Sequence, residues 1–157
     1  MENLNKDIIH QFYTAFQHRD YAAMQDLYHD DAEFHDPVFQ KLTSKEVKAM
    51  WQMLLSAAKD LSISFADVKV DGASGSCRWE ACYTFGSTRR QVNNIVRATF
   101  VFNDGKIVRH CDDFNLWRWT MMALGISGVL LGWFPWVQNK IRHTAQDKLR
   151  KFMDITQ

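Results

Sequence analysis

Residues 28–38 read Tyr-His-Asp-Asp-Ala-Glu-Phe-His-Asp-Pro-Val, and they contain the most informative pair of the chain, Asp36-Pro37. Residues 32–36 predict a short strand that follows two helical segments. Pro37 fixes its own φ angle and cannot donate a hydrogen bond to a sheet, so the strand must stop or turn there. Asp36 is therefore expected at the end of a strand, among apolar neighbours such as Phe34.

Asp36 allows two interpretations. A carboxylate held among apolar side chains tends to have a raised pKa and can act as a general base, which makes Asp36 a candidate catalytic residue. Aspartate also caps turns, so a residue placed before Pro37 can serve the backbone alone. Both interpretations stay open here, because the sequence indicates a site without naming a reaction.

The segments around this strand have the apolar spacing of helices. Apolar residues three and four apart predict a first helix over residues 4–16 and a second over residues 20–28, which Asp20 is expected to cap. Residues 43–46, Thr-Ser-Lys-Glu, have the form of a capping box and predict a third helix over residues 43–58. Three helices are thus expected before the main run of strands.

Beyond residue 62 the apolar period changes to two, which predicts strands. Asn103-Asp104-Gly105 is a strong hairpin signal between the last two of them. Helices followed by a run of strands predict the α+β class, with helices packed on one face of the sheet. The expected strands cover residues 63–70, 78–85, 95–102 and 106–114.

The composition predicts one folded domain of nearly neutral charge. The chain has 157 residues, of which 46% are hydrophobic, enough for one core. The formal net charge of +1 gives no reason to expect a nucleic-acid partner. Three cysteines without metal-ligand spacing predict free thiols in a cytoplasmic protein, and residues 1–7 lack the apolar segment of a signal peptide. Neither a cofactor nor a metal is expected.

The order of these elements, together with residues 28–38, resembles the ketosteroid isomerase and SnoaL-like branch of the nuclear transport factor 2-like superfamily. The resemblance covers about residues 4–118. It implies a cone-shaped curved sheet, mixed or antiparallel, wrapped by three N-terminal helices around an apolar interior pocket. The expected division is a cone domain over residues 1–115 and a helical extension over residues 116–157, packed on the same domain. Because this superfold hosts enzymes, binding modules and adaptors alike, it assigns no activity.

The expected pocket is lined mainly by apolar side chains. Residues two apart on a strand share a face, which places His110 and Asp112 beside Val108 and Phe114 on the last strand. An apolar pocket with a few polar groups is typical of a site for a small hydrophobic molecule. The side chains predicted to contact this ligand are those of Phe12, Phe34, Trp51, Trp79, Tyr83, Asn94, Val96, Ala98 and Phe114.

His110 and Asp112 are further candidate catalytic residues. An imidazole beside a carboxylate can act as an acid or a base, and the resemblance implies that Asp112 occupies the position of a catalytic aspartate. The alternative, which stays open, is a buried hydrogen-bonded pair that ties the strand end to the following helix. A metal site at His35 and Asp36 is not expected, because neighbouring residues on a strand point to opposite faces.

Departures from the family limit the expected chemistry. In ketosteroid isomerases a tyrosine of the first helix and a protonated aspartate form an oxyanion hole, and the matching positions here are Phe12 and Ala98. Tyr13 is expected to face elsewhere, so both donors are missing and steroid isomerisation is not expected. The arginine of limonene-epoxide hydrolases has no clear match either, unless Arg78 or Arg97 faces inward.

The C-terminal third is unusually apolar. Residues 119–137 carry no charge, and four of the six tryptophans lie between residues 117 and 136. Gly125 and Gly128 predict a break between two short helices, and residues 137–152 predict an amphipathic basic helix. Three arrangements stay open: a lid over the cone, a homodimer interface, or a membrane-associated segment that lies on the surface or spans it.

Three functions follow from these observations. The first is binding of a small hydrophobic molecule, with no activity assigned. The second is a cofactor-independent isomerase, cyclase or hydrolase that uses Asp36, His110 and Asp112 as general acid and base. The third is a peripheral membrane or lipid-binding module that acts through residues 116–157.

Overall fold

The helices and strands follow the order that the sequence predicts. The structure is a computed structural model, and it describes residues 1–156. The helices are α1 (Glu2–Gln17), α2 (Tyr21–Asp26), α3 (Ser44–Ala57), α4 (Leu116–Leu124), α5 (Ile126–Leu131) and α6 (Pro135–Thr156). The strands are β1 (Tyr28–Asp36), β2 (Gln40–Thr43), β3 (Ser62–Asp71), β4 (Ser74–Thr84), β5 (Gln91–Asn103) and β6 (Lys106–Asp113).

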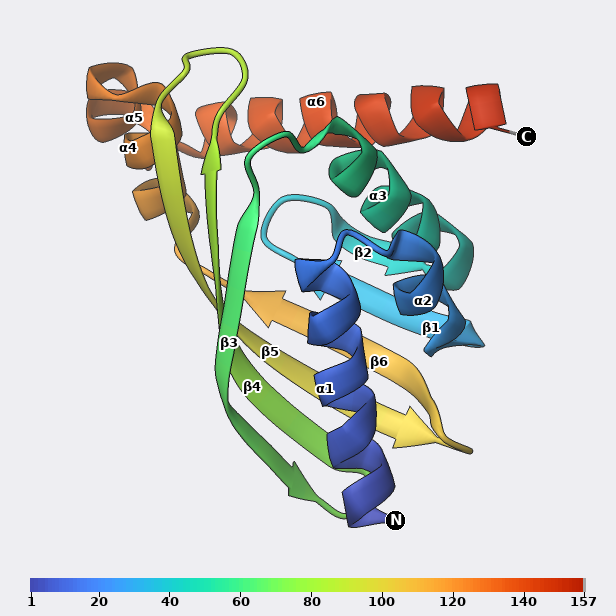
Figure 1. Ribbon diagram of the computed structural model, residues 1–157. Coiled ribbons are helices and arrows are strands. Elements are labelled where there is room, and N and C mark those ends of the chain that lie inside the picture. Colours follow the sequence, from blue (N-terminus) through green and yellow to red (C-terminus); the bar gives the residue numbers. More distant parts are fainter. Residues whose placement is uncertain (157) are drawn as a thin grey trace.

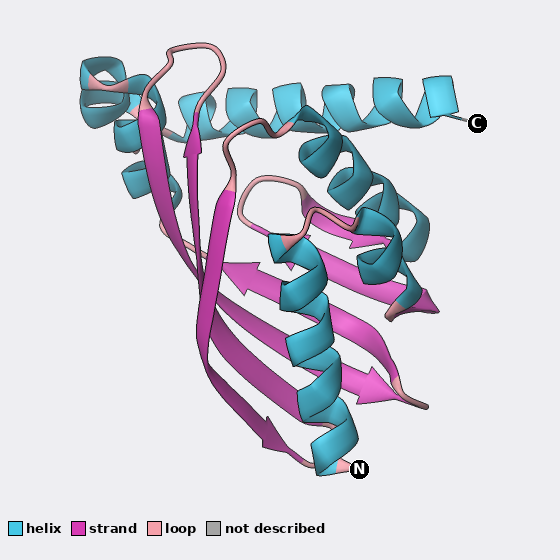
Figure 2. Cartoon of the chain, viewed as in Figure 1, coloured by secondary structure: helices cyan, strands magenta, loops and turns pink. Residues whose placement is uncertain are grey.

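One curved, six-stranded sheet organises the chain, with strand order β2-β1-β6-β5-β4-β3. The β1–β6 pair is parallel and every other neighbouring pair is antiparallel, so the sheet is mixed. The helices α1 and α3 lie against the concave side of this sheet (Figures 1 and 2). This arrangement confirms the predicted α+β class and the predicted wrapping of a curved sheet by N-terminal helices.

The predicted helix caps are present. Asp20 Oδ1 accepts the backbone N–H of Ala23 at 3.0 Å and so begins α2. At the start of α3 the Thr43 hydroxyl accepts the Glu46 N–H, and the Glu46 carboxylate accepts the Thr43 N–H at 2.7 Å. These bonds satisfy backbone donors that the first helical turn leaves free, and they set where each helix meets the sheet.

The start of β1 differs from the prediction. Tyr28 was expected to close the second helix, but it is the first residue of β1 and pairs with Ile107 of β6. The strand therefore begins four residues before Ala32, and Asp30 and Asp31 lie on it as exposed residues. The short edge strand β2 was not predicted at all. It pairs with β1 through Phe34 and Leu42.

An extra residue in β6 corrects the predicted alternation of that strand. Phe102 pairs with Ile107, whereas Val101 pairs with Arg109, so Val108 is left over as a bulge. Ile107 is consequently buried on the concave side together with His110, while Val108 is only partly buried. The predicted common face of Val108 and His110 is therefore wrong, whereas that of His110 and Asp112 is correct.

The C-terminal residues form two short helices and one long one. Gly125, with φ of +67°, ends α4 at the predicted break, and Gly128 lies inside α5. A Cβ atom on Gly128 would lie 1.9 Å from the Thr120 carbonyl oxygen, so only glycine lets α5 approach α4 this closely. Within residues 1–156 no helix has both the length and the hydropathy needed to cross a membrane.

The long helix α6 packs across the turn that follows β1. The Leu149 side chain of α6 is buried, and α6 contacts α3. Arg142 Nε donates to the Pro37 carbonyl oxygen at 2.9 Å, and Gln146 Nε2 donates to that of Phe39 at 3.3 Å. The turn after Asp36 is thereby held by a helix more than a hundred residues away in sequence.

Candidate functional site

Asp36 is both a turn cap and a carboxyl group with a perturbed pKa. Its Oδ1 accepts the backbone N–H groups of Val38 at 2.8 Å and Phe39 at 2.6 Å, so Asp36 does cap this turn. The side chain is nevertheless buried, with a relative exposure of 8%. Burial, assisted by the negative charge of Asp112, raises the pKa of Asp36 from 3.8 to about 7 against those hydrogen bonds. Near neutral pH this carboxyl can therefore either hold or release a proton.

The parallel pairing of β1 with β6 brings the two candidate carboxylates together. Phe34 pairs with His110, and His35 pairs with Cys111. One residue further along each strand come Asp36 and Asp112, both buried on the concave side. The sequence-based prediction that Asp36, His110 and Asp112 share one face of the sheet is thus met by the geometry.

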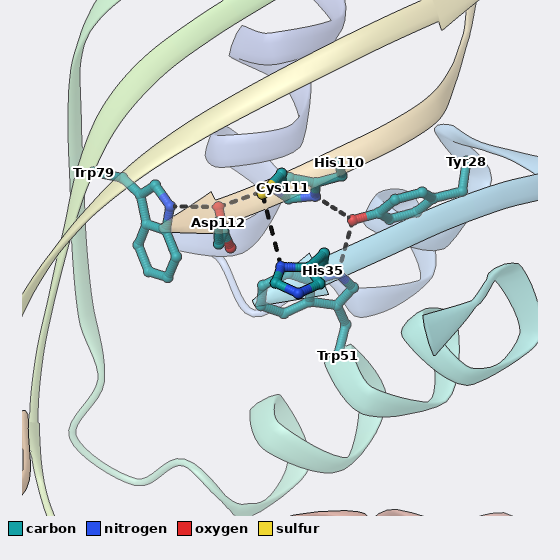
Figure 3. Close-up of polar contacts among 7 residues, drawn as sticks. All are labelled: Tyr28, His35, Trp51, Trp79, His110, Cys111 and Asp112. Carbon is teal, nitrogen blue, oxygen red and sulfur yellow. Dashed lines mark hydrogen bonds and ion pairs between the residues drawn. The ribbon is translucent and has the colours of Figure 1, made fainter. Parts of the chain in front are cut away.

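A chain of hydrogen bonds runs across this interior (Figure 3). Trp79 Nε1 donates to Asp112 Oδ1 at 3.2 Å, and His110 Nε2 lies 3.0 Å from the same oxygen. On the other side of the imidazole, Tyr28 Oη lies 2.6 Å from His110 Nδ1 and accepts Trp51 Nε1–H at 3.0 Å. Five side chains from α3, β1, β4 and β6 are therefore linked in one buried network.

One placement of protons satisfies this network. An indole N–H can only donate, so Trp51 occupies Tyr28 Oη as an acceptor, and the tyrosine hydroxyl is free to donate to His110 Nδ1. Nε2 then carries the imidazole proton and donates it to Asp112, which also accepts from Trp79. Burial raises the pKa of Tyr28 well above its usual value, which keeps its hydroxyl protonated. In this arrangement His110 is neutral, and each of the nitrogen and oxygen atoms named here has a partner.

Tyr13 is a site residue that sequence reasoning placed wrongly. It was expected to face away from the interior, yet it is fully buried and its ring contacts those of Trp79 and Phe100. Among the side-chain atoms of residues 1–156, Tyr13 Oη is the one buried polar atom without a hydrogen-bond partner. Burial first, and the charge of Asp112 next, raise the pKa of Tyr13 well above its usual value. The Cys77 thiol lies beside this hydroxyl but makes no regular hydrogen bond with it, and sulfur is only a weak acceptor, so Tyr13 Oη can still donate to an oxygen atom.

Helical periodicity carried a weak signal for Tyr13. Phe12 and Phe16 define the apolar face of α1, and position 13 lies at the edge of that face. A periodic pattern cannot tell whether an edge residue turns inward, because the answer depends on the space left by the sheet. Here the bend of the sheet lets both Phe12 and Tyr13 reach it.

The predicted ligand-contacting residues divide into two groups. Those in the first group are buried and pack against one another and against His110; Phe34 and His110, for example, have ring centroids 5.1 Å apart. This group consists of Phe12, Phe34, Trp51, Trp79, Val96 and Ala98. The second group is only partly buried and consists of Tyr83, Asn94 and Phe114. A ligand would therefore have to enter past this second group.

The C-terminal helices touch the partly buried group directly. Trp119 Nε1 of α4 donates to Tyr83 Oη at 2.8 Å, and the rings of Trp119 and Phe85 lie 5.4 Å apart. Burial raises the pKa of Tyr83. The helix α4 thus packs on this end of β4 and β5.

Both arginines considered for hydrolase chemistry lie on the outer face. Arg78 and Arg97 are paired across β4 and β5. Each is next in sequence to a buried, inward-facing residue, Trp79 or Ala98, and so points to the opposite face. The Arg78 guanidinium pairs with Glu80 at 2.5 Å on that outer face. Neither arginine can therefore reach the concave interior.

Two hollows in the surface lie apart from the interior network. One, of about 700 Å³, is formed by β3 to β6 around Lys69, Thr99 and Arg109. The other, of about 380 Å³, lies between the β2 region and α6 around Lys41 and Gln146. Neither is lined by Asp36, His110 or Asp112.

The acidic and histidine-rich stretch of β1 does not converge on a metal. Asp36 is buried, whereas His35 is exposed and its Nδ1 lies 3.9 Å from Cys111 Sγ on the outer face, so the predicted alternation is confirmed (Figure 3). Within the described part of the chain no three His, Cys, Asp or Glu side chains are grouped as metal ligands would be. The three cysteines are free thiols.

A curved mixed sheet with helices packed on its concave face, in this order of elements, is the fold of the nuclear transport factor 2-like class. The chain belongs to the SnoaL-like domain family, which matches residues 9–110. No curated protein sequence matches it.

Solved structures of this class share the fold at low identity. An LEH-like epoxide hydrolase from M. tuberculosis is similar with a TM-score of 0.67 and 15% identity, over 83% of this chain and 98% of that one. TerC, crystallised with polyporic acid, has a TM-score of 0.67 and 16% identity, over 77% and 98%. IdmH from Streptomyces antibioticus, a candidate polyketide cyclase, has a TM-score of 0.64 and 20% identity, over 76% and 97%. At these identities the similarity establishes the fold alone.

Proposed function

We propose that this protein binds a small, largely apolar molecule on the concave side of its sheet and exchanges a proton with that molecule through Asp36. The observation that carries the proposal is the buried Asp36 carboxyl, whose pKa is raised to about 7. A general acid or base works best when its pKa lies near the working pH. A turn cap by itself needs no such pKa, since capping aspartates are ordinarily ionised.

Asp112 and His110 support this role from the neighbouring strand. The negative charge of Asp112 favours the protonated form of Asp36, as expected for two carboxylates that share a site. The His110 imidazole holds Asp112 in place through the 3.0 Å contact with Oδ1. Tyr13 Oη, which lacks a partner, offers a hydrogen-bond donor for an oxygen atom of the bound molecule.

The chemistry of these groups favours a carbonyl-bearing or polyketide-like substrate. Proton transfer between carbon and oxygen needs an acid–base group and a donor, and this site offers both without a cofactor. Ketosteroid isomerisation of the familiar kind is not expected, because Ala98 occupies the position of the second donor. Among similar structures, IdmH is a candidate polyketide cyclase and TerC was co-crystallised with polyporic acid, which is consistent with this substrate class. Epoxide hydrolysis is less favoured, because Arg78 and Arg97 face outward.

Binding without turnover is the second candidate function. The observation in its favour is that Trp51, Tyr28, His110, Asp112 and Trp79 already satisfy one another. A network of that kind stabilises a fold as readily as it serves catalysis. Asp36, Tyr13 and the second carboxylate oxygen of Asp112 would then be the polar groups left to contact a ligand.

The experiment compares Asp36→Asn with Asp31→Asn, the same change at an exposed position of the same strand. Asparagine can still accept the N–H groups of Val38 and Phe39, so the turn is kept while the ionisable group is lost. Thermal-shift screening of aromatic ketones, phenols and hydroxyquinones, polyporic acid among them, identifies binders of the wild-type protein. Each binder is then incubated with the wild-type protein and with both variants, and its conversion is followed by mass spectrometry.

Conversion by the wild-type and Asp31→Asn proteins, but not by Asp36→Asn, is the expected result. Binding with no conversion by any of them would assign the second candidate. Carbon-13 NMR of the aspartate carboxyls gives an independent reading. An Asp36 carboxyl that titrates near pH 4 would contradict the proposal.

A further inference from the structure

Six exposed large apolar residues of the chain are gathered in one segment. They lie on α5, on the connection that follows it and at the start of α6, next to the β4–β5 hairpin (Figure 1). Two tryptophans are each 60% exposed. This segment, called the apolar tip below, consists of Ile126, Val129, Leu130, Leu131, Trp133 and Trp136.

The apolar tip is held in place by specific contacts. Arg90 Nε of the hairpin donates to the Met122 carbonyl oxygen at 2.9 Å, and Thr88 Oγ1 donates to that of Ala123 at 2.5 Å. The contact of Gly128 with the backbone of Thr120 fixes α5 on α4. The inner sides of these helices are therefore packed, and the exposed apolar side chains are what remains on the outer side.

Such exposure requires a partner. Removing one large apolar side chain from water stabilises a protein by about 1.5–3 kcal/mol, and single domains seldom leave a contiguous group of them exposed. Of the arrangements that the sequence leaves open, each would cover these side chains, and within this chain they are exposed. Something outside the chain has to cover them.

The charges around the apolar tip indicate what that partner is. Residues 115–146 contain no aspartate or glutamate. The exposed cations Arg118 and Lys140 lie in the same segment, and Arg89 and Arg90 come from the adjoining hairpin. Lys140 follows Trp136 by one helical turn and so shares its face of α6. The segment and the adjoining hairpin loop thus contribute positive charges and no carboxylate around the apolar centre, which makes this surface complementary to an apolar phase covered by anionic groups.

We propose that the apolar tip docks on the surface of a membrane that contains anionic lipid. Tryptophan is enriched where an apolar phase meets water, and the aliphatic side chains of α5 would enter the acyl region. The lysine and arginine side chains would reach the headgroups, as they do in other interfacial helices. This inference goes beyond the proposed function and does not depend on Asp36.

A second copy of the chain fits the same surface less well. In a two-fold dimer each tip would face its own copy, which brings the positive charges of both together with no carboxylate of this segment between them. Anionic lipid neutralises those charges instead. The dimer therefore becomes an outcome of the test.

Sedimentation with vesicles is the test. The full chain is mixed with vesicles of phosphatidylcholine alone or of phosphatidylcholine with phosphatidylglycerol, at low and high salt. We expect binding to the anionic vesicles, a blue shift of tryptophan emission, and weaker binding at high salt because the headgroup contacts are screened. The double variant Leu130→Ser/Trp133→Ser should bind at least about tenfold more weakly, given the transfer free energy of one such side chain.

Matched controls come from the far end of α6. Ile155 is 84% exposed, so Ile155→Ser removes a comparable side chain outside the tip and should bind as the parent does. Arg118→Gln/Lys140→Gln should weaken binding to anionic vesicles, because it removes two cations beside the apolar tip. Its control is Lys148→Gln/Lys151→Gln, which should bind as the parent does, because Lys148 lies about 18 Å from Trp136 at 1.5 Å per residue. Asp36→Asn should leave vesicle binding unchanged, which keeps this test separate from that of the proposed function.

Two results would overturn the proposal. One is failure of the wild-type protein to bind vesicles of either composition. The other is a dimer, seen by analytical ultracentrifugation, that Leu130→Ser/Trp133→Ser dissociates while vesicle binding is absent. The second result would assign the apolar tip to a second copy of the chain.

Discussion

Tyr28 Oη lies 2.6 Å from His110 Nδ1, and this contact fixes the imidazole between an aromatic hydroxyl and the Asp112 carboxylate. Because Tyr28 also accepts from Trp51, its only proton points at His110. A protonated Nδ1 would deprive that hydroxyl proton of its acceptor. The neutral imidazole is therefore part of how the interior holds together.

Replacing Tyr28 by phenylalanine tests this network. Tyr28→Phe leaves the Trp51 N–H without an acceptor and His110 Nδ1 without a donor in a buried place. We expect the free energy of unfolding to fall by about 2–4 kcal/mol, the cost of leaving two buried polar atoms unpaired. Urea unfolding at neutral pH measures the change. Tyr21→Phe, a partly exposed tyrosine of α2, is the control and should change stability by less than about 0.5 kcal/mol.

Asp36 should make stability depend on pH. Its pKa is about 7 in the folded protein against an ordinary value of 3.8, so the folded state binds the proton more tightly than the unfolded state does. The stabilisation by this group is complete below about pH 4 and is lost as the pH rises through 7. With about 1.4 kcal/mol per pKa unit between 3.8 and about 7, the full loss amounts to about 4 kcal/mol.

Asp36→Asn removes this dependence. The difference in unfolding free energy between pH 4.5 and pH 8, measured with urea, should be smaller in Asp36→Asn than in the parent by about 2–4 kcal/mol. Asp31→Asn should keep the parent's profile. Parallel pH profiles of the parent and Asp36→Asn would show that this carboxyl titrates in the ordinary range.

Tyr13→Phe should separate stability from binding. Removing a buried hydroxyl that has no partner relieves its desolvation, so the free energy of unfolding should stay the same or rise by about 1 kcal/mol. If Tyr13 donates to a ligand oxygen, affinity for the ligand falls at the same time. Chemical unfolding and calorimetry with the compound found by screening measure the two effects. A clear loss of stability would mean that Tyr13 Oη does have a partner.

Gly128→Ala should loosen the C-terminal helices. The added methyl group meets the Thr120 carbonyl, and such overpacking costs about 1–3 kcal/mol. We expect faster hydrogen exchange in α4 and α5 with little change in β1 and β6. Gly86→Ala is the control, because nothing lies within 4 Å of a Cβ atom at that position. Unchanged exchange in Gly128→Ala would mean that α5 does not sit this close to α4.

The alternation of apolar and polar residues along the strands predicted most of the residues on the concave face of the sheet. Asp36, His110, Asp112, Trp79 and Val96 were assigned to one side by alternation, and each is buried there. Alternation works because one face of this sheet is covered by helices, which fixes the register. It failed at Val108, where a bulge adds one residue and leaves no trace in the local pattern.

The site was harder to predict than the face. Tyr28 continues the apolar spacing of Met24 and so looks helical, and only its pairing with the distant Ile107 makes it a strand residue. The bonds from Trp51 to Tyr28 and from Trp79 to Asp112 depend on where separate elements meet, which no local spacing encodes. The cap at Asp36 was predictable because both its acceptor and its donors lie within three residues.

The contacts of α6 with the turn after β1 join the last helix of the chain to the residues that Asp36 caps. Arg142 donates a hydrogen bond to the carbonyl oxygen of Pro37, and Gln146 donates one to that of Phe39. Without α6 both carbonyl oxygens would lose these donors. The order of the turn that Asp36 caps therefore depends on a helix beyond residues 9–110, the part of the chain that the SnoaL-like family shares.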